Sequence, residues 1–256
     1  DFSLTVEQGS TTVFLGASGC GKTTLMRMVN AMVTPTSGRV FVREQDVAGE
    51  DPVRLRRSIG YVLQEGGLFP HRTIADNIAT VPRLEGATKQ ASRERALELL
   101  TLVGLDREMA DRYPAQLSGG QRQRVGVARA LANRADILLM DEPFGALDPI
   151  VRAELQRELK EIQRALGTTI LFVTHDVDEA FTLGDQVAVL STGGHIEQVG
   201  TPTELLSSPA SPFVAEFVGA SRAARPVRVA GPGGLVVDDA GTPVGTLTTD
   251  EAGERP

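Results

Sequence analysis

Cysteine and long apolar runs are scarce in this 256-residue sequence, and each scarcity excludes a class of protein. Cys20 is the only cysteine, so an intrachain disulfide is impossible, which fits a reducing compartment. No apolar run approaches the roughly 20 residues that an α-helix needs to cross a bilayer. The sequence therefore predicts neither a disulfide-stapled fold nor a membrane-spanning segment.

An excess of positive charge is also lacking. The 26 Lys and Arg residues are outnumbered by 33 Asp and Glu residues, which gives a net charge of −7. Proteins that bind polyanions generally present an excess of Lys and Arg to them. The composition therefore argues against nucleic acid, and against an anionic lipid surface, as the main partner.

What the sequence does contain is a regular alternation of strand and helix patterns. Phe2, Leu4 and Val6 alternate with polar residues, which predicts a half-buried strand. Further strands are expected at 11–15, 39–42, 59–63, 137–140, 169–174 and 186–191, and helices at 87–103, 151–166 and 176–183. A short helix is also expected to begin at Asp51-Pro52, with Asp51 as its cap and Pro52 at the first helical position. Such alternation is typical of the α/β class, with a mainly parallel sheet and crossover helices.

Two stretches depart from this alternation. Between about residues 76 and 133 the patterns are helical, which predicts a subdomain inserted into a domain that spans residues 1–219. Residues 220–256 hold two short strand patterns around an Asp-Ala-Gly turn at 239–241, in a Gly- and Pro-rich context, too little to form a core alone. We interpret 220–256 as a tail. Because the chain opens on a strand pattern without an initial Met, we also expect a fragment that has lost its natural start.

The segment from Gly16 to Thr23 matches G-x-x-x-x-G-K-[ST] between an apolar strand and an amphipathic helix. Glycines let several backbone N–H groups point at phosphates, and the helix N-terminus adds partial positive charge. We expect Lys22 to reach the β- and γ-phosphates of ATP and Thr23 to offer its hydroxyl to Mg²⁺. The expected nucleotide-binding residues here are Gly16, Ala17, Ser18, Gly19, Cys20, Gly21, Lys22, Thr23 and Thr24.

Two adjacent carboxylates follow the apolar strand pattern at 137–140. Asp141 and Glu142 would lie at the carboxyl end of that strand, where α/β proteins bind ligands. Because neighbouring strand residues point to opposite sides, we expect Asp141 to face the metal and Glu142 to face the attacking water. This division suits hydrolysis, which needs a metal for phosphate charge and a base for water.

A second anion-binding motif, Leu117–Gln121, precedes another helix pattern. Ser118 and the amides of Gly119 and Gly120 can line a helix N-terminus, with Gln121 beside them. Taken alone, this pentapeptide would be an ordinary helix cap. Its position 23 residues before Asp141 favours the functional interpretation.

In combination these motifs resemble those of the ATP-binding subunits of ABC transporters, over about residues 1–219. Gln64 in Tyr-Val-Leu-Gln is similar to the family's Q-loop, Asp148 in Ala-Leu-Asp to its D-loop, and His175 in Val-Thr-His-Asp to its switch histidine. The resemblance implies a P-loop NTPase core of the ABC-ATPase type, with an inserted α-helical subdomain and a small antiparallel β portion.

The resemblance also implies a head-to-tail dimer, either a homodimer or a pair of related ATPase subunits. Each ATP would lie between Gly16–Thr23 of one subunit and Ser118–Gln121 of the other, with Asp148 also at the nucleotide. Glu142 would orient or deprotonate water, His175 would contact the γ-phosphate, and Gln64 would touch metal or water. Family members usually stack an aromatic ring on adenine; that residue should precede Asp1 and is absent from this chain.

Within the family, Gly66–His71 and Thr73–Ile78 resemble the importers of osmoprotectants such as glycine betaine, choline, carnitine and proline. Membership implies a peripheral protein at the cytoplasmic face of the cell membrane. Its partners would be integral membrane permease subunits and, indirectly, an extracytoplasmic solute-binding protein. Leu235–Leu247 resembles one strand pair of the CBS modules found after such ATPases, and a loosely ordered tail is the alternative.

Two other classes of function stay open: an importer of another polar solute, and an ABC ATPase of DNA repair or translation that transports nothing. If these segments are generic importer features, the solute could be a polyamine, a sugar or an amino acid. ABC ATPases of DNA repair carry a long coiled coil between the two motifs, whereas only 96 residues without heptads separate Lys22 from Ser118. Translation-factor ABC proteins carry two cassettes in one chain, whereas this sequence has one.

Overall fold

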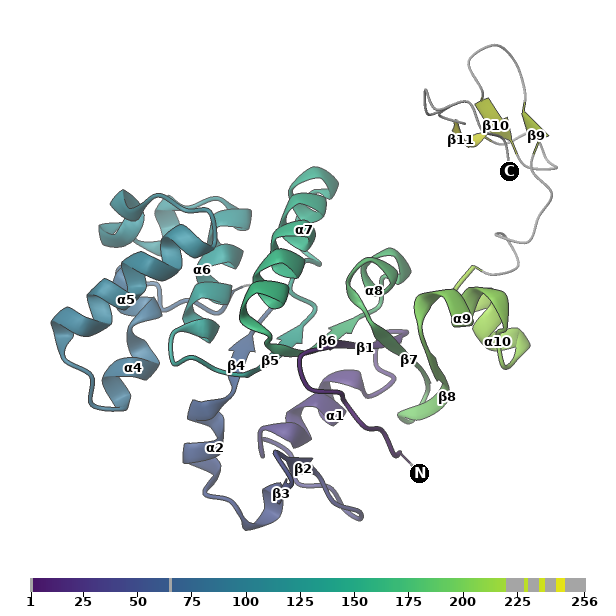
Figure 1. The fold of residues 1–256 in the computed structure, drawn as a ribbon, viewed down its shortest axis with the longest axis horizontal. Helices are drawn as coiled ribbons and strands as arrows, with labels where there is room; N and C mark the ends of the chain where they lie inside the picture. Colours follow the sequence, from purple (N-terminus) through teal and green to yellow (C-terminus); the bar gives the residue numbers. More distant parts are fainter. Residues whose placement is uncertain (1, 65, 220–227, 230–234, 238–242, 247–256) are drawn as a thin grey trace. The chain divides into compact units, whose positions relative to one another are not determined.

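The computed structural model describes residues 2–64, 66–219, 228–229, 235–237 and 243–246 (Figure 1). The chain divides into two compact units, residues 1–202 and residues 203–256. The first unit holds the central sheet and every residue to which the sequence assigned chemistry. The domain limits expected from the sequence, with a boundary after residue 219, stay a prediction.

A six-stranded sheet organises the first unit, in the order β4-β5-β6-β1-β7-β8 (Figure 1). The first five strands are mutually parallel, and β8 pairs antiparallel with β7. Their bounds are β1 Thr11–Gly16, β4 Gly60–Val62, β5 Ile137–Asp141, β6 Thr169–Thr174, β7 Gln186–Ser191 and β8 His195–Gly200. Parallel pairing brings the carboxyl ends of β4, β5, β6 and β1 to one edge of the sheet, next to one another.

Helices lie on both sides of this sheet (Figure 1), with α1 on one side and α7 and α8 on the other. A helical group comes between β4 and β5 in the chain. The helices of the unit are α1 Lys22–Val29, α2 Pro52–Ser58, α3 Ile74–Ile78, α4 Thr80–Leu84, α5 Lys89–Leu102, α6 Gly119–Leu131, α7 Pro149–Leu166 and α8 Val177–Leu183. Three 3₁₀ turns, at Val47–Gly49, Arg107–Asp111 and Pro114–Gln116, and the hairpin of β2 (Phe41–Val42) and β3 (Gln45–Asp46) complete it.

Short polar side chains start the helices. Asp51 accepts hydrogen bonds from the N–H groups of Val53 and Arg54, and Pro52 occupies the first helical position of α2, as the sequence predicts. Asp148 and Asp176 cap α7 and α8 in the same way. These caps fix the points at which the loops that follow β5 and β6 end.

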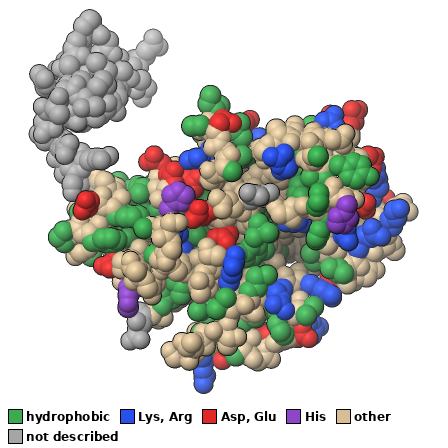
Figure 2. Space-filling view, turned by 180° about the vertical axis from the view of Figure 1, so that it is seen from behind, with side chains coloured by type: hydrophobic (Ala, Val, Ile, Leu, Met, Phe, Trp, Pro, Cys, Tyr) green, Lys and Arg blue, Asp and Glu red, His purple; other side chains and the backbone are tan. Residues whose placement is uncertain are grey.

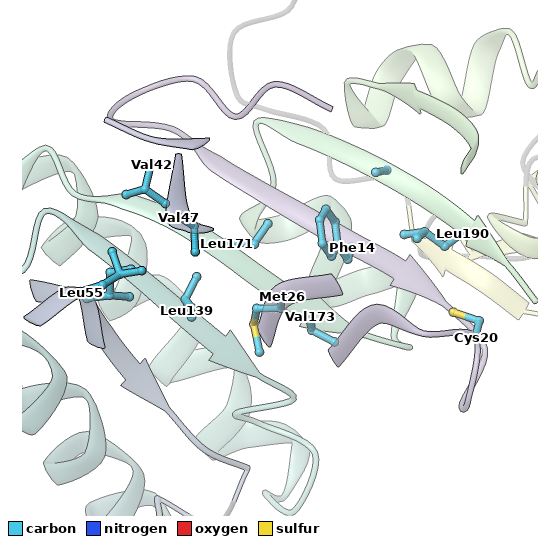
Figure 3. Packing of buried hydrophobic residues seen from close by; sticks show 12 residues of the cluster. Phe14, Cys20, Met26, Val42, Val47, Leu55, Leu139, Leu171, Val173 and Leu190 are labelled. Atoms are coloured by element: carbon cyan, nitrogen blue, oxygen red, sulfur yellow. The ribbon is translucent and has the colours of Figure 1, made fainter. Parts of the chain in front are cut away.

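One cluster of the hydrophobic core lies between the sheet and α1 (Figure 3). Phe14 of β1, Leu139 of β5 and Val173 of β6 pack in one buried cluster with Met26 of α1. Met26 is fully buried. Burying such side chains stabilises the fold by about 1.5–3 kcal/mol each, so the core holds α1, and the loop before it, against the sheet.

The structure differs from the expected strands in three places. Residues 2–7 form no strand, although Phe2, Leu4 and Val6 do pack against the core; the segment has no strand partner to complete a ladder. The strand expected at 39–42 is only the two-residue β2. The sequence analysis did not predict β8, whose residues are mostly half-buried and lack a strong alternation.

The second unit contains two short helices, α9 (Pro202–Ser207, whose first residue closes the first unit) and α10 (Pro212–Phe217). A small antiparallel sheet follows, in the order β11-β10-β9, from Arg228–Val229, Leu235–Val237 and Pro243–Thr246. The pairing of β10 with β11 confirms the two strands expected in the tail. The turn expected at residues 239–241 lies outside the described residues.

Charged side chains of both signs are interspersed over the face shown in Figure 2, with hydrophobic side chains between them. Within the described part of the chain, no helix has the length and apolarity to cross a bilayer.

A substitution at Gly60 would test the packing between β4 and its neighbours. A Cβ at this position would lie 2.6 Å from the carbonyl oxygen of Ala130 and would also overlap the side chain of Leu138. We expect Gly60→Ala to lower the free energy of unfolding by about 1–3 kcal/mol, the usual cost of overpacking. Gly49→Ala is the control because no atom lies within 4 Å of its Cβ position. Equal urea midpoints for the two variants would contradict this packing.

Candidate functional site: the carboxyl edge of the parallel sheet

The phosphate loop, Gly16–Thr23, connects the end of β1 to the start of α1. The Nζ of Lys22 donates to the carbonyl oxygens of Gly16 at 2.7 Å and Ala17 at 2.9 Å, and only 4% of Lys22 is exposed. Gly19 and Gly21 have φ angles of 79° and 109°, which glycine adopts without strain. The loop therefore curls around its own lysine.

Two further observations explain the residue types in this loop. A Cβ at Gly16 would lie 2.5 Å from the carbonyl oxygen of Leu190, so β7 leaves room only for glycine there. Cys20 is buried in the core cluster, which agrees with a packing role for its thiol. Ala17, Ser18 and Gly19 are exposed residues, as is Thr24 in the first turn of α1.

Thr23 joins this loop to β5. Its hydroxyl donates to Oδ1 of Asp141 at 2.7 Å. The other carboxylate oxygen, Oδ2, accepts from the phenol of Tyr61 at 3.3 Å and lies 3.7 Å from the guanidinium of Arg27. Burial raises the pKa of Tyr61, so the phenol stays protonated and can donate. Asp141 is thus held on one oxygen, and its other oxygen is directed at Thr23.

Glu142 points differently from Asp141, but not for the reason that strand alternation suggested. It lies beyond the end of β5 and has a φ of 46°, in the left-handed region that non-glycine residues seldom adopt. Its N–H donates to the carbonyl of Val173, and its Oε2 lies 3.1 Å from Nδ1 of His175. Backbone strain held by β6, rather than pleating, therefore directs this carboxylate toward His175.

Gln64 reaches the same edge from β4. A Cβ on Gly145 would lie 3.3 Å from Nε2 of Gln64, so the side-chain amide lies against the loop after Glu142. The structure thus gathers Lys22, Thr23, Asp141, Glu142, His175 and Gln64 from four neighbouring strands.

The Leu117–Gln121 motif forms a separate cluster at the start of α6. Ser118 and Gln121 cap each other: the hydroxyl accepts from the Gln121 N–H at 3.2 Å, and the Gln121 side chain accepts from the Ser118 N–H at 2.9 Å. Asp148, exposed at the start of α7, accepts from the N–H of Val151. Across the residues that the structure describes, no hydrogen bond or ion pair links Ser118–Gln121 to the phosphate loop, Glu142 or His175.

Comparison with known proteins identifies this arrangement. The sequence model of the family described as ABC transporter matches residues 1–145, more than half of the chain. The chain belongs to the ABC transporter family. Its fold agrees with that of the dimeric ATP-binding cassette MJ0796, solved in a post-hydrolysis state with ADP and Pi. That similarity has a TM-score of 0.70 at 33% identity and covers 78% of this chain and 88% of that one.

Named relatives include two bacterial transport proteins. The glycine betaine/carnitine/choline transport ATP-binding protein OpuCA of Bacillus subtilis is 54% identical over 86% of this ABC chain and 57% of its own length. The sulfate/thiosulfate import ATP-binding protein CysA of Brucella melitensis is 51% identical over 89% of this chain and 63% of its own length. The chain therefore spans less than two thirds of these relatives.

These findings confirm the predicted ABC-type α/β fold with a parallel sheet and a small antiparallel β portion. Sequence reasoning missed Tyr61 and Arg27, which hold the far oxygen of Asp141. Arg27 belongs to no motif that the sequence analysis used, and Tyr61 entered only as the first residue of the Tyr-Val-Leu-Gln segment, with no role assigned to it. The only available signal was the position of Tyr61 in a strand next to the one that carries Asp141.

The backbone at Glu142 allows a direct test of the left-handed conformation. Glycine adopts positive φ freely, whereas an alanine there pays about 1 kcal/mol or more. We expect Glu142→Gly to exceed Glu142→Ala in free energy of unfolding by about 1 kcal/mol, measured in urea. An alanine variant as stable as the glycine variant would show that this φ is wrong.

Proposed function

We propose that this chain binds ATP with Mg²⁺ and hydrolyses it as the ATP-binding subunit of an importer for a quaternary-amine osmoprotectant. The observation that carries the proposal is the pair of contacts beside the phosphate loop, Thr23 with Asp141 and Glu142 with His175. Lys22, two hard oxygen donors and a carboxylate that could act as a base lie at one edge of a sheet. Hydrolysis of a phosphoanhydride requires these groups together.

The donor set at Thr23 and Asp141 suits Mg²⁺. This ion favours oxygen ligands and is usually held by one or two carboxylates together with substrate phosphates and waters. Thr23 Oγ1 and Asp141 Oδ1 are such oxygens and already lie 2.7 Å apart. When bound, Mg²⁺ would neutralise charge on the phosphates; Gln64 would be a further oxygen ligand or would contact water.

The remaining roles fall to side chains of the chain itself. Lys22 would exchange its contacts with Gly16 and Ala17 for the β- and γ-phosphates. Glu142 would orient or deprotonate the attacking water, and His175, which is exposed and contacts Glu142, would reach the γ-phosphate. The backbone N–H groups from Ala17 to Thr24 would surround the phosphates.

We also propose that the site is completed by a second copy or a related ATPase subunit. Ser118–Gln121 presents a helix N-terminus with an exposed serine, and among the described residues no hydrogen bond or ion pair links that motif to its own phosphate loop. In a head-to-tail dimer it would bind the γ-phosphate held by the partner, with Asp148 nearby, so ATP would bridge the subunits. The dimeric form of the MJ0796 cassette supports this arrangement.

The proposed solute is glycine betaine, choline or carnitine, because the Bacillus relative is named for these compounds. The chain would act at the cytoplasmic face of the membrane with integral permease subunits and, indirectly, an extracytoplasmic solute-binding protein. Another polar solute is the second candidate, since the sulfate/thiosulfate relative from Brucella is almost as similar.

Removing the base should separate ATP binding from hydrolysis. We expect Glu142→Gln to reduce the hydrolysis rate at least about a hundredfold and to accumulate an ATP-bound dimer, since loss of general-base catalysis commonly costs this much. Size-exclusion chromatography with light scattering, with and without Mg-ATP, would detect the dimer. Lys22→Ala is the control and should stay monomeric. Turnover of Glu142→Gln at the parental rate would refute the role of Glu142.

The solute can be tested in the natural host. Deleting the gene should abolish uptake of labelled glycine betaine, choline or carnitine at high osmolarity and leave sulfate uptake unchanged. Re-expression of the parent chain should restore uptake, and Glu142→Gln should not. Loss of sulfate uptake in the deletion strain, with betaine uptake intact, would favour the second candidate.

A further inference from the structure

Arg152, in the first turn of α7, contacts three separate acceptors. One guanidinium nitrogen, NH2, donates to the carbonyl of Leu147 at 3.2 Å, and NH1 lies 3.1 Å from Oδ2 of Asp176. Its Nε is buried without a hydrogen-bond partner among the described residues and makes a longer ion-pair contact, 3.7 Å, with Oε1 of Glu179. The side chain therefore connects the loop before α7 to the start of α8. No motif in the sequence accounts for this residue.

The acceptors on α8 belong to the network that surrounds His175. Asp176 directly follows His175; its N–H donates to the hydroxyl of Thr174, and that hydroxyl donates to Oε2 of Glu179 at 2.6 Å. Oδ1 of Asp176 accepts from two N–H groups of α8, which leaves Oδ2 for Arg152. The residues on both sides of His175 are thus fixed by a chain of bonds that ends at Arg152.

His175 itself depends on this support. Its side chain is 56% exposed, and Glu142 is its one hydrogen-bond partner among the described residues. With so little packing around the ring, the backbone from Thr174 to Asp176 determines where the imidazole points. A shift of that backbone would move the ring relative to Glu142.

The first turn of α7 and the residue Leu147 before it also contact the Leu117–Gln121 motif. A Cβ on Gly120 would lie 2.7 Å from Cγ1 of Val151, and a Cβ on Gly119 would lie 3.5 Å from Cδ2 of Leu147. Leu147 is also the residue whose carbonyl accepts from Arg152. One short segment therefore lies against Gly119 and Gly120 on one side and supports the His175 loop on the other.

We propose that Arg152 is a positioning residue for hydrolysis: through Asp176 it sets His175, and through Leu147 it links His175 to the Leu117–Gln121 motif. This inference rests on the proposed ATPase function. In the proposed dimer, His175 serves the ATP of its own phosphate loop, and Gly119 and Gly120 serve the other ATP. Arg152 would then transmit closure at one site to the histidine of the other.

A double-mutant cycle of ATP hydrolysis with the full chain tests this role. We expect Arg152→Ala to lower kcat about ten- to a hundredfold, the cost of misplacing a catalytic group, with KM for ATP changed less than about twofold. In a His175→Ala background the same substitution should have no further effect, because Arg152 acts through His175. Arg157→Ala, an exposed arginine of the same helix, is the control and should keep the parental kcat.

Two results would overturn the proposal. One is an equal fall in kcat from Arg152→Ala with and without His175; the other is a raised KM with unchanged kcat. If Arg152→Ala does not fold, Asp176→Asn replaces it, because asparagine keeps the helix cap and removes the charge that Arg152 contacts. As a single substitution, Asp176→Asn should lower kcat. In the His175→Ala background it should have no further effect on kcat. An inactive parent chain would instead refute the proposed ATPase function.

Discussion

The hydrogen bond from Thr23 to Asp141 joins two segments that lie 118 residues apart in the sequence. Asp141 ends β5, and Thr23 lies in α1 just after β1; since β6 lies between β5 and β1 in the sheet, the bond crosses the end of one strand. It forms only because the parallel order β5-β6-β1 places all three carboxyl ends at the same edge. Tyr61 of β4 then holds the outer oxygen of the same carboxylate. The strand order thus determines where phosphate, metal and water would meet.

The proposed second anion site, Leu117–Gln121, lies elsewhere in the chain. Ser118 and Gln121 cap each other at the start of α6, and the glycines between them pack on the first turn of α7. Each half of the proposed composite site is therefore formed by contacts within one chain. On this account, ATP supplies the contact between two preformed halves, which explains why one chain can carry both motifs without joining them.

Local signals in the sequence predicted most of the fold and located the motifs along it. Phosphate-loop glycines and helix caps such as Asp51 depend on neighbours a few residues away, so their spacing identifies them. Features that depend on distant strands were missed: β8, and the left-handed backbone at Glu142, which is held by Val173 of the next strand. Residues 2–7 show the opposite case. The predicted alternation of buried and exposed side chains is present there, but the segment has no partner strand and forms no strand itself.

The most direct measurement is a complementation assay with two inactive chains, Lys22→Ala and Ser118→Arg. A mixed dimer would keep one intact site, formed by the phosphate loop of the Ser118→Arg chain and the Leu117–Gln121 motif of the Lys22→Ala chain. Random mixing should restore up to about a quarter of the parental ATPase activity, since half of the dimers keep one of two sites. If differently tagged mixed dimers form and no activity returns, the composite site is contradicted.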